Sequence, residues 1–136
     1  MKFKKIVFLI IAFFAAFFTS KFIQNAYSEE KTIQLTQIDF NQTEHNFSTL
    51  KKDREASIYF KYKNTGQNPL KISSISSRCG CTIPKWSKDP LLPNQTDSIL
   101  VSYDAKEMGY FSKEIYVISN AQTSPDVLYI KGMVSE

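Results

Sequence analysis

Apolar and polar residues alternate in short runs along most of the chain beyond its first 30 residues. The clearest run covers residues 55–63, and the residues on its apolar face are Ala56, Ile58, Phe60 and Tyr62. Because successive side chains of a strand point to opposite sides of the sheet, this pattern predicts a half-buried strand. The other runs that predict strands are Ile33–Phe40, Leu70–Ser77, Ser98–Tyr103, Phe111–Ser119 and Val127–Val134.

Turn-forming residues separate these runs, and beyond residue 30 we find no 3.6-residue helical period. Short strands with turns between them predict an all-β fold, and we expect an immunoglobulin-like antiparallel β-sandwich of six to eight strands. Residues 78–93 contain three prolines and are expected to be irregular. The predicted structural turn residues are Asn64, Gly66, Gly80 and Gly109, and Gly66 is expected to supply the positive φ of a tight turn.

The first 28 residues predict a targeting segment. A lysine-rich start precedes the apolar run Ile6–Phe18, whose 13 residues would span roughly 20 Å as a helix, less than the ~30 Å membrane core. Residues 26–28 (AYS) fit a cleavage site, so we predict a signal peptide at 1–28 and a sandwich domain at 29–136. The alternative is an uncleaved anchor in the inner membrane, because Phe22 and Ile23 extend the apolar run.

The charge distribution supports the same interpretation. The formal net charge is +4, and residues 1–28 contain four lysines and no acidic residue, so the remainder is neutral. A neutral domain argues against a nucleic-acid partner. We therefore expect an exported protein of the periplasm or cell envelope, in contact with the membrane only if the leader is uncleaved.

Cys79 and Cys81 flank Gly80 and form the most unusual group of residues in the chain. The favoured interpretation is two small packed thiols at a strand end, beside a glycine where backbones approach closely. A second alternative is a disulfide, within the chain if Gly80 turns or between chains, which would be able to exchange with other thiols. A third is a pair of thiolates that binds Cu(I), the one cofactor considered, since zinc needs more ligands.

No acid–base or nucleophile constellation suggests an enzyme, and the single histidine, His45, is expected in a solvated loop. Tyr59, Tyr116 and Tyr129 fall on the outward faces of predicted strands, and tyrosine is favoured at interfaces. We therefore expect a non-enzymatic module that binds an unidentified envelope protein through a sheet face or an edge strand. The alternatives are scattered surface tyrosines and a thiol site for Cu(I) or disulfide exchange.

Several motifs resemble a known bacterial family. They include Phe60–Gly66 (FKYKNTG), Cys79–Trp86 (CGCTIPKW) and Gly109–Asn120 (GYFSKEIYVISN), within a match over residues 38–134. The chain resembles the domain of unknown function 1573, common in Bacteroidetes, which implies an exported immunoglobulin-type sandwich without an established role. The family tends to have Asp-Phe-Gly where this chain has residues 46–48 (NFS), and a glycine where it has Asn94; we expect both turns to be retained.

Overall fold

The computed structural model describes residues 34–136, and within them it is built from eight strands without a helix. The strands are β1 (Ile38–Phe40), β2 (Glu44–Lys51), β3 (Ala56–Asn64), β4 (Ile72–Ser77), β5 (Thr82–Lys85), β6 (Thr96–Tyr103), β7 (Gly109–Ser119) and β8 (Asp126–Ser135). The predicted all-β sandwich of six to eight strands is confirmed. The predictions for residues 1–28 lie outside the described residues. Over residues 34–136, no helix has the length and apolar character needed to cross a membrane.

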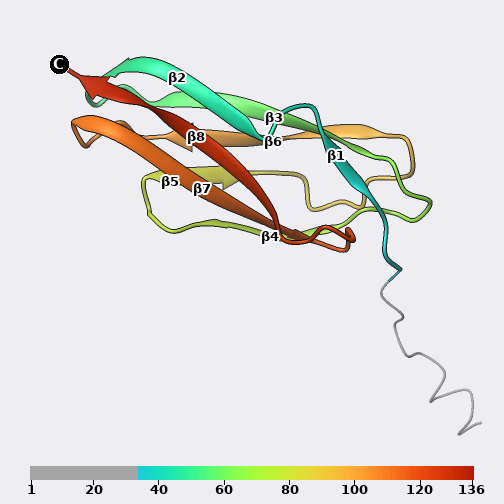
Figure 1. Cartoon of the computed structure of the whole chain (residues 1–136). Coiled ribbons are helices and arrows are strands. Elements are labelled where there is room, and N and C mark those ends of the chain that lie inside the picture. The colour runs from blue at the N-terminus through green and yellow to red at the C-terminus, as the bar shows by residue number, and fades with distance from the viewer. Residues whose placement is uncertain (1–33) are drawn as a thin grey trace, which may run out of the picture. The chain divides into compact units, whose positions relative to one another are not determined.

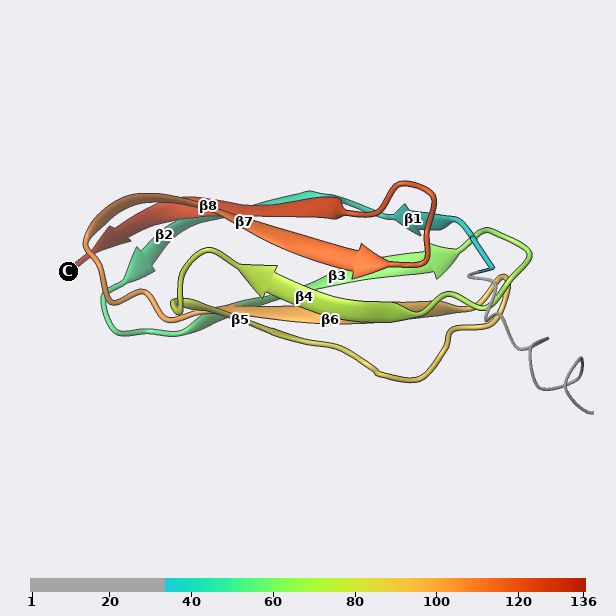
Figure 2. The same cartoon turned by 90° about the horizontal axis from the view of Figure 1, so that it is seen from below.

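The strands form two sheets of four, stacked face to face (Figures 1 and 2). One sheet has the order β1-β3-β6-β5 and is antiparallel throughout; the other has the order β2-β8-β7-β4. In the second sheet β2 pairs with β8 in parallel, so the fully antiparallel arrangement that we predicted is wrong for this pair. The reason is that the chain passes from β1 to β2 without reversing direction (Figure 2).

The core lies between the sheets and follows the predicted alternation. On β3, Phe60 is 0% exposed and Tyr62 is 3% exposed, whereas Tyr59 between them is 58% exposed. The rings of Tyr103 on β6 and Phe111 on β7 stack across the two sheets with centroids 4.0 Å apart. The other fully buried apolar side chains are Leu70, Ile99, Val101, Ala105, Ile115, Val117, Leu128, Ile130 and Val134. Burial of these apolar groups is the main force that holds the sheets together.

The pattern of residues did not predict β2 or β5. In β2 the register with β8 shifts between Asn46 and Thr49, and Ser48 has a φ of 57°, so a bulge interrupts the alternation. The Ser48 N–H donates to Asn46 Oδ1 (2.9 Å), which supports the turn expected at residues 46–48. His45 lies in β2 with its ring edge against Phe47, so its predicted loop position is wrong. In β5, Pro84 is tolerated because the strand lies at a sheet edge.

Candidate functional site

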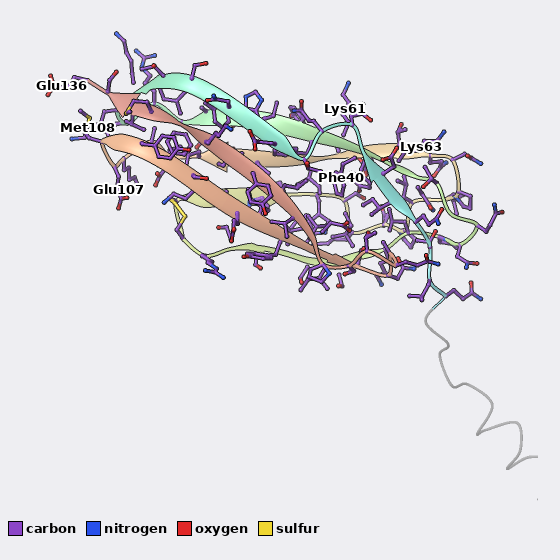
Figure 3. All side chains as sticks on the ribbon, in the orientation of Figure 1. Phe40, Lys61, Lys63, Glu107, Met108 and Glu136 are labelled. Atoms are coloured by element: carbon purple, nitrogen blue, oxygen red, sulfur yellow. A yellow bond between two sulfur atoms is a disulfide. The ribbon has the colours of Figure 1, made fainter. Side chains whose placement is uncertain are left out.

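The structure joins Cys79 and Cys81 by a disulfide in the turn between β4 and β5. Their Cα atoms are 5.3 Å apart, inside the normal range for a disulfide, because the chain turns at Gly80 and Cys81. No free cysteine exists among the described residues. The favoured expectation of two packed thiols is therefore wrong, and the structure contains the intramolecular disulfide that we kept as an alternative. Figure 3 shows this bond in yellow at the periphery of the sandwich.

Gly80 occupies an open position in this disulfide turn, which we define as residues 78–82. A Cβ atom built on Gly80 meets nothing within 4 Å, so the predicted close approach of backbones is wrong. Among glycines of the described residues, positive φ occurs at Gly109 alone, at 103°. Gly80 is thus a turn residue, as predicted, but neither sterics nor a left-handed conformation requires glycine there. Gly109 fulfils the role expected of it at the start of β7.

Two hydroxyl groups surround the disulfide. Thr82 is 4% exposed, and its Oγ1 lies 3.8 Å from Cys79 Sγ and 3.9 Å from Cys81 Sγ. Ser77 Oγ donates a hydrogen bond of 2.7 Å to the carbonyl oxygen of Cys79. One buried hydroxyl can therefore donate to either sulfur, and another holds the start of the turn.

Charged groups of β7 and of the disulfide turn lie beside the disulfide. A surface depression is lined by Arg78, Cys79, Ser112, Lys113 and Glu114. Cys81, in contrast, packs against the hydrophobic core. Both cysteines are half-buried, but Cys79 lines the depression and Cys81 packs against the core.

Tyr116 connects the depression to the outer surface of its sheet. The Arg78 guanidinium lies 5.9 Å from the centre of the Tyr116 ring, within cation–π range. The Tyr116 hydroxyl donates to Glu114 Oε2, and this hydrogen bond raises the pKa of Tyr116 above its usual value. Tyr116 therefore belongs both to the surroundings of the disulfide and to the predicted tyrosine patch.

The structure brings together two of the three tyrosines predicted as an interaction patch. In the β7–β8 register, Tyr116 is opposite Val127 and Glu114 is opposite Tyr129, so the two tyrosines are diagonal neighbours on one face. Tyr59 lies on β3 in the other sheet and therefore on a different face of the sandwich. A patch of all three tyrosines is thus ruled out.

The face that carries these two tyrosines is more apolar than the tyrosines alone suggest. Tyr110 is 69% exposed, Ile118 44%, Met133 43% and Tyr129 38%. We define the outer β7–β8 face as Tyr110, Tyr116, Ile118, Val127, Tyr129 and Met133. Met133 was missed, although its position in the period-two pattern of the last strand would have revealed it. On the same side of β8, between Tyr129 and Met133, Lys131 pairs with Glu44 of β2, and the hydrogen bond from Lys131 to the carboxylate raises the pKa of Lys131.

Asn64 is a buried connector rather than only a turn residue. It is 0% exposed, and its Oδ1 accepts from Thr36 Oγ1 (2.9 Å) and from the Gly66 N–H (3.1 Å). Its Nδ2 donates to the carbonyl oxygens of Asn68 and Leu91, both at 2.8 Å. Every hydrogen-bonding position of the amide is therefore occupied. The side chain of Asn64 therefore joins the end of β3 to the segment before β1, to the loop at residues 66–68, and to the segment around Leu91.

Gly66 supports Asn64 by leaving room. A Cβ atom at Gly66 would overlap Thr36 Oγ1 and lie 2.5 Å from the backbone nitrogen of Gln37. The expected positive φ at Gly66 is wrong, because close approach of residues 36–37 is what requires glycine here. Asn94 does adopt positive φ, at 66°, so the turn expected there is retained.

The side chains do not form a preorganised metal centre in the part of the chain that the structure describes. No group of three or more His, Cys, Asp or Glu residues gathers among residues 34–136. The alternative of a Cu(I) site on Cys79 and Cys81 would require reduction of their disulfide first, because the thiolate is the metal ligand.

Comparison with solved structures places this fold among known sandwiches. A protein of unknown function from Porphyromonas gingivalis W83 matches 79% of the chain with a TM-score of 0.66 and 15% identity. PapD-like domain 7 of human CEP192 matches 80% of the chain and 92% of that domain, with a TM-score of 0.63 and 11% identity. The VesB protease of Vibrio cholerae matches 74% of the chain but 32% of its own length, with a TM-score of 0.56 and 15% identity.

These likenesses show the fold alone, and the chain spans half the length of the Porphyromonas protein. A search of curated proteins finds no match. The model of the family described as "Protein of unknown function (DUF1573)" matches residues 38–134, which is nearly all of the described chain. This protein therefore belongs to the DUF1573 family.

Proposed function

We propose that this protein is an exported, non-enzymatic module of the cell envelope that binds another protein through its outer β7–β8 face. The observation that carries the proposal is the gathering of large exposed side chains on that face. Four of the nine exposed large hydrophobic residues in the described chain, Tyr110, Ile118, Tyr129 and Met133, are found there. Exposed large apolar side chains that gather on one face are typical of protein-binding sites.

The pairing of β7 with β8 places these side chains on one face. Tyr110 is directly opposite Met133, and Tyr116 is opposite Val127, so these apolar side chains are cross-strand neighbours. Between the two pairs, Ser112 is opposite Lys131 and Glu114 is opposite Tyr129, so polar and charged groups lie among the apolar ones. Tyrosine and methionine are enriched in protein interfaces.

The opposite outer face offers less to a partner. Tyr59 and Ile83 are the large hydrophobic residues exposed on the outward side of β3, β5 and β6, at 58% and 51%, whereas the outer β7–β8 face carries four such residues. Tyrosine and methionine, which that face contains, are enriched in protein interfaces. We therefore assign the partner to the outer β7–β8 face rather than to the β3 side.

The family and the compartment support the remaining parts of the proposal. Membership of a family of unknown function and a likeness to a PapD-like domain are compatible with a module that does no chemistry of its own. The Cys79–Cys81 disulfide supports export, because disulfides persist mainly in oxidising compartments. Mass spectrometry of the protein isolated from envelope fractions tests export, with Glu29 expected as its first residue. An intact Met1 on a cytoplasmic protein would contradict it.

Photocrosslinking tests the assigned face. A photoreactive phenylalanine analogue is placed at Tyr129 or, as the matched control, at Tyr59, in the full chain expressed in its native envelope. We expect a discrete crosslinked protein from position 129 and none from position 59. The double substitution Tyr110→Ser and Tyr129→Ser should weaken binding of that protein by about thirtyfold or more, the loss of a typical aromatic anchor. Equal crosslinking from both positions would contradict the assignment.

A further inference from the structure

The disulfide turn has features that a purely structural crosslink does not need. We propose that the Cys79–Cys81 disulfide exchanges with a dithiol of a client polypeptide, and that Cys79 Sγ is the sulfur attacked. This activity is distinct from binding at the outer β7–β8 face, although Tyr116 belongs to the surroundings of both sites. It rests on three observations: the different surroundings of the two cysteines, positive charge beside Cys79, and a buried hydroxyl group within reach of both sulfurs.

Access distinguishes the two sulfurs. Cys79 lines the depression together with Arg78, Ser112 and Glu114, whereas Cys81 packs against the core. Gly80 between them has no atom within 4 Å of the position of a Cβ, so nothing covers the turn from that side. Because exchange depends on which sulfur an incoming thiolate can reach, attack is directed to Cys79.

Charge favours the incoming nucleophile. The attacking species is a thiolate anion, and Arg78 and Lys113 place two cations on the lining of the depression. The one carboxylate there, Glu114, accepts a hydrogen bond from Tyr116. The cation–π contact with the Tyr116 ring holds the Arg78 guanidinium on this side of the turn. The depression is thus suited to bind a thiolate next to Cys79.

A hydroxyl group stabilises the leaving group. When the disulfide opens, Cys81 carries the negative charge, and Thr82 Oγ1 lies 3.9 Å from its sulfur. Thr82 is 4% exposed, so little water competes for this contact. A hydrogen bond to the departing thiolate makes it a better leaving group, and a better leaving group makes the exchange faster.

The exchange is balanced in atoms and electrons. A client thiolate bonds to Cys79 Sγ while the Cys79–Cys81 bond breaks, and its electron pair stays on Cys81 Sγ, which takes up a proton. The second client thiolate then attacks the client sulfur of the mixed disulfide, and Cys79 leaves as a thiolate and is protonated. The client is oxidised by two electrons to a disulfide, and Cys79 and Cys81 are reduced to thiols.

The first test measures exchange with a synthetic peptide that contains two cysteines. The full chain and an oxidised peptide of residues 77–83 are mixed with this probe, acid-quenched, alkylated and analysed by mass spectrometry. We expect the full chain to react at least about tenfold faster than the short peptide, which has the same disulfide without the depression. Equal rates would overturn the proposal.

Two substitutions separate the parts of the site. Thr82→Val should slow the exchange by about fivefold, the effect of one lost hydrogen bond. Arg78→Gln should slow it by about threefold, and Arg78→Lys should restore most of the rate because the charge is kept. Lys85→Gln on β5 removes an exposed charge that does not line the depression, and should leave the rate unchanged. Equal slowing by Arg78→Gln and Lys85→Gln would contradict a local role for Arg78.

The second test identifies the attacked sulfur. Brief reaction of the full chain with reduced glutathione, followed by acid quenching and peptide mapping, should show glutathione on Cys79 in at least about nine of ten mixed disulfides. In Cys81→Ser, the remaining thiol should react with an aromatic disulfide reagent at least about tenfold faster than the thiol of Cys79→Ser. The peptide mapping uses the unmodified chain, so it identifies the attacked sulfur even if a cysteine variant does not fold. Glutathione mainly on Cys81 would overturn the assignment.

Discussion

The two ends of the sandwich solve the same local problem in opposite ways. At the end that contains the β3–β4 connection, Asn64 makes four hydrogen bonds and Gly66 leaves no room for a side chain. At the other end, the turn around Gly80 is open and a covalent bond joins Cys79 to Cys81. Figure 3 places Lys63 at the first end, and Glu107 and Met108 at the second, where the yellow disulfide also lies.

The difference teaches that two glycine-containing turns of one domain can have unrelated roles. The Asn64 end is closed, because side chains, backbone and neighbouring segments satisfy one another completely. The disulfide end is open, so its bond is accessible to a second molecule while the rest of the domain stays packed. Packing constrains the first end and a disulfide constrains the second. Substitutions at the two ends should therefore differ sharply in their effect on stability.

The largest effect is expected at the closed end. Asn64→Ala removes all four hydrogen bonds of a fully buried side chain and leaves the Gly66 N–H without its acceptor, so we expect a loss of about 3–4 kcal/mol in unfolding free energy. Urea unfolding followed by tryptophan fluorescence measures this loss. Asn41→Ala, at an exposed asparagine between β1 and β2, is the matched control and should change stability by less than about 0.5 kcal/mol. Equal losses for both variants would remove the special role of Asn64.

The next effect depends on pH and concerns Tyr62, two residues before Asn64. Burial, and then the charge of Asp97 and the hydrogen bond to it, raise the pKa of Tyr62 from 10.0 to about 12. Folding therefore favours the neutral phenol by roughly 2–3 kcal/mol. This contribution is complete below pH 10, decreases as the pH rises from 10 to about 12, and is absent above that range.

Unfolding measured from pH 8 to pH 12 tests this sign. The wild-type protein should lose stability above pH 10, and Tyr62→Phe should lose markedly less over the same range. The exposed Tyr59→Phe is the control and should follow the wild-type curve. A Tyr62→Phe curve parallel to the wild-type curve would contradict the assignment of this pH dependence to Tyr62.

A third effect separates close packing from conformation. Gly66→Ala places a methyl group against Thr36 and Gln37, so we expect a loss of about 2 kcal/mol, the usual cost of overpacking. The double substitution Gly66→Ala with Thr36→Ser retains the hydroxyl group and the clash, and should not recover stability. Thermal unfolding measures both variants. If Gly66→Ala left the stability unchanged, residues 36 and 37 would not pack against Gly66 as the structure shows.

The smallest effect is expected at the open end. Gly80→Ala adds a methyl group where no atom lies within 4 Å and where φ is not positive, so stability should change by less than about 0.5 kcal/mol. The disulfide should still form, as shown by the absence of free thiols after denaturation. A loss comparable to that of Gly66→Ala would erase the difference between the two turns.

Much of the fold was predictable because period-two alternation depends on local sequence. The run around Phe60 gave β3 directly, and the last two runs gave β7 and β8. β2 was missed because the bulge at Ser48 breaks the alternation. Its parallel pairing with β8 depends on the path of the chain between sheets, which a local pattern does not contain.

The candidate sites were predictable only in part, because they depend on contacts between distant residues. Tyr116 and Tyr129 were expected to lie together if their strands paired, and β7 and β8 do pair. The alternation within β3 could not predict which sheet contains Tyr59, because it shows only which side chains point outward. The disulfide was an alternative, since it requires a turn at Gly80 that the sequence permits but does not impose. Asn64 was recognised as a turn residue, but its four partners come from three other parts of the chain.

Amide hydrogen exchange of the native protein, followed residue by residue by NMR, tests the contrast between the two ends most directly. The amides of Gly66 and Lys71 donate to the side chains of Asn64 and Asn120, and should exchange only with global unfolding. The amide of Gly80, in the exposed turn, should exchange at least about a hundredfold faster. Similar protection of Gly66 and Gly80 would contradict a closed end and an open end.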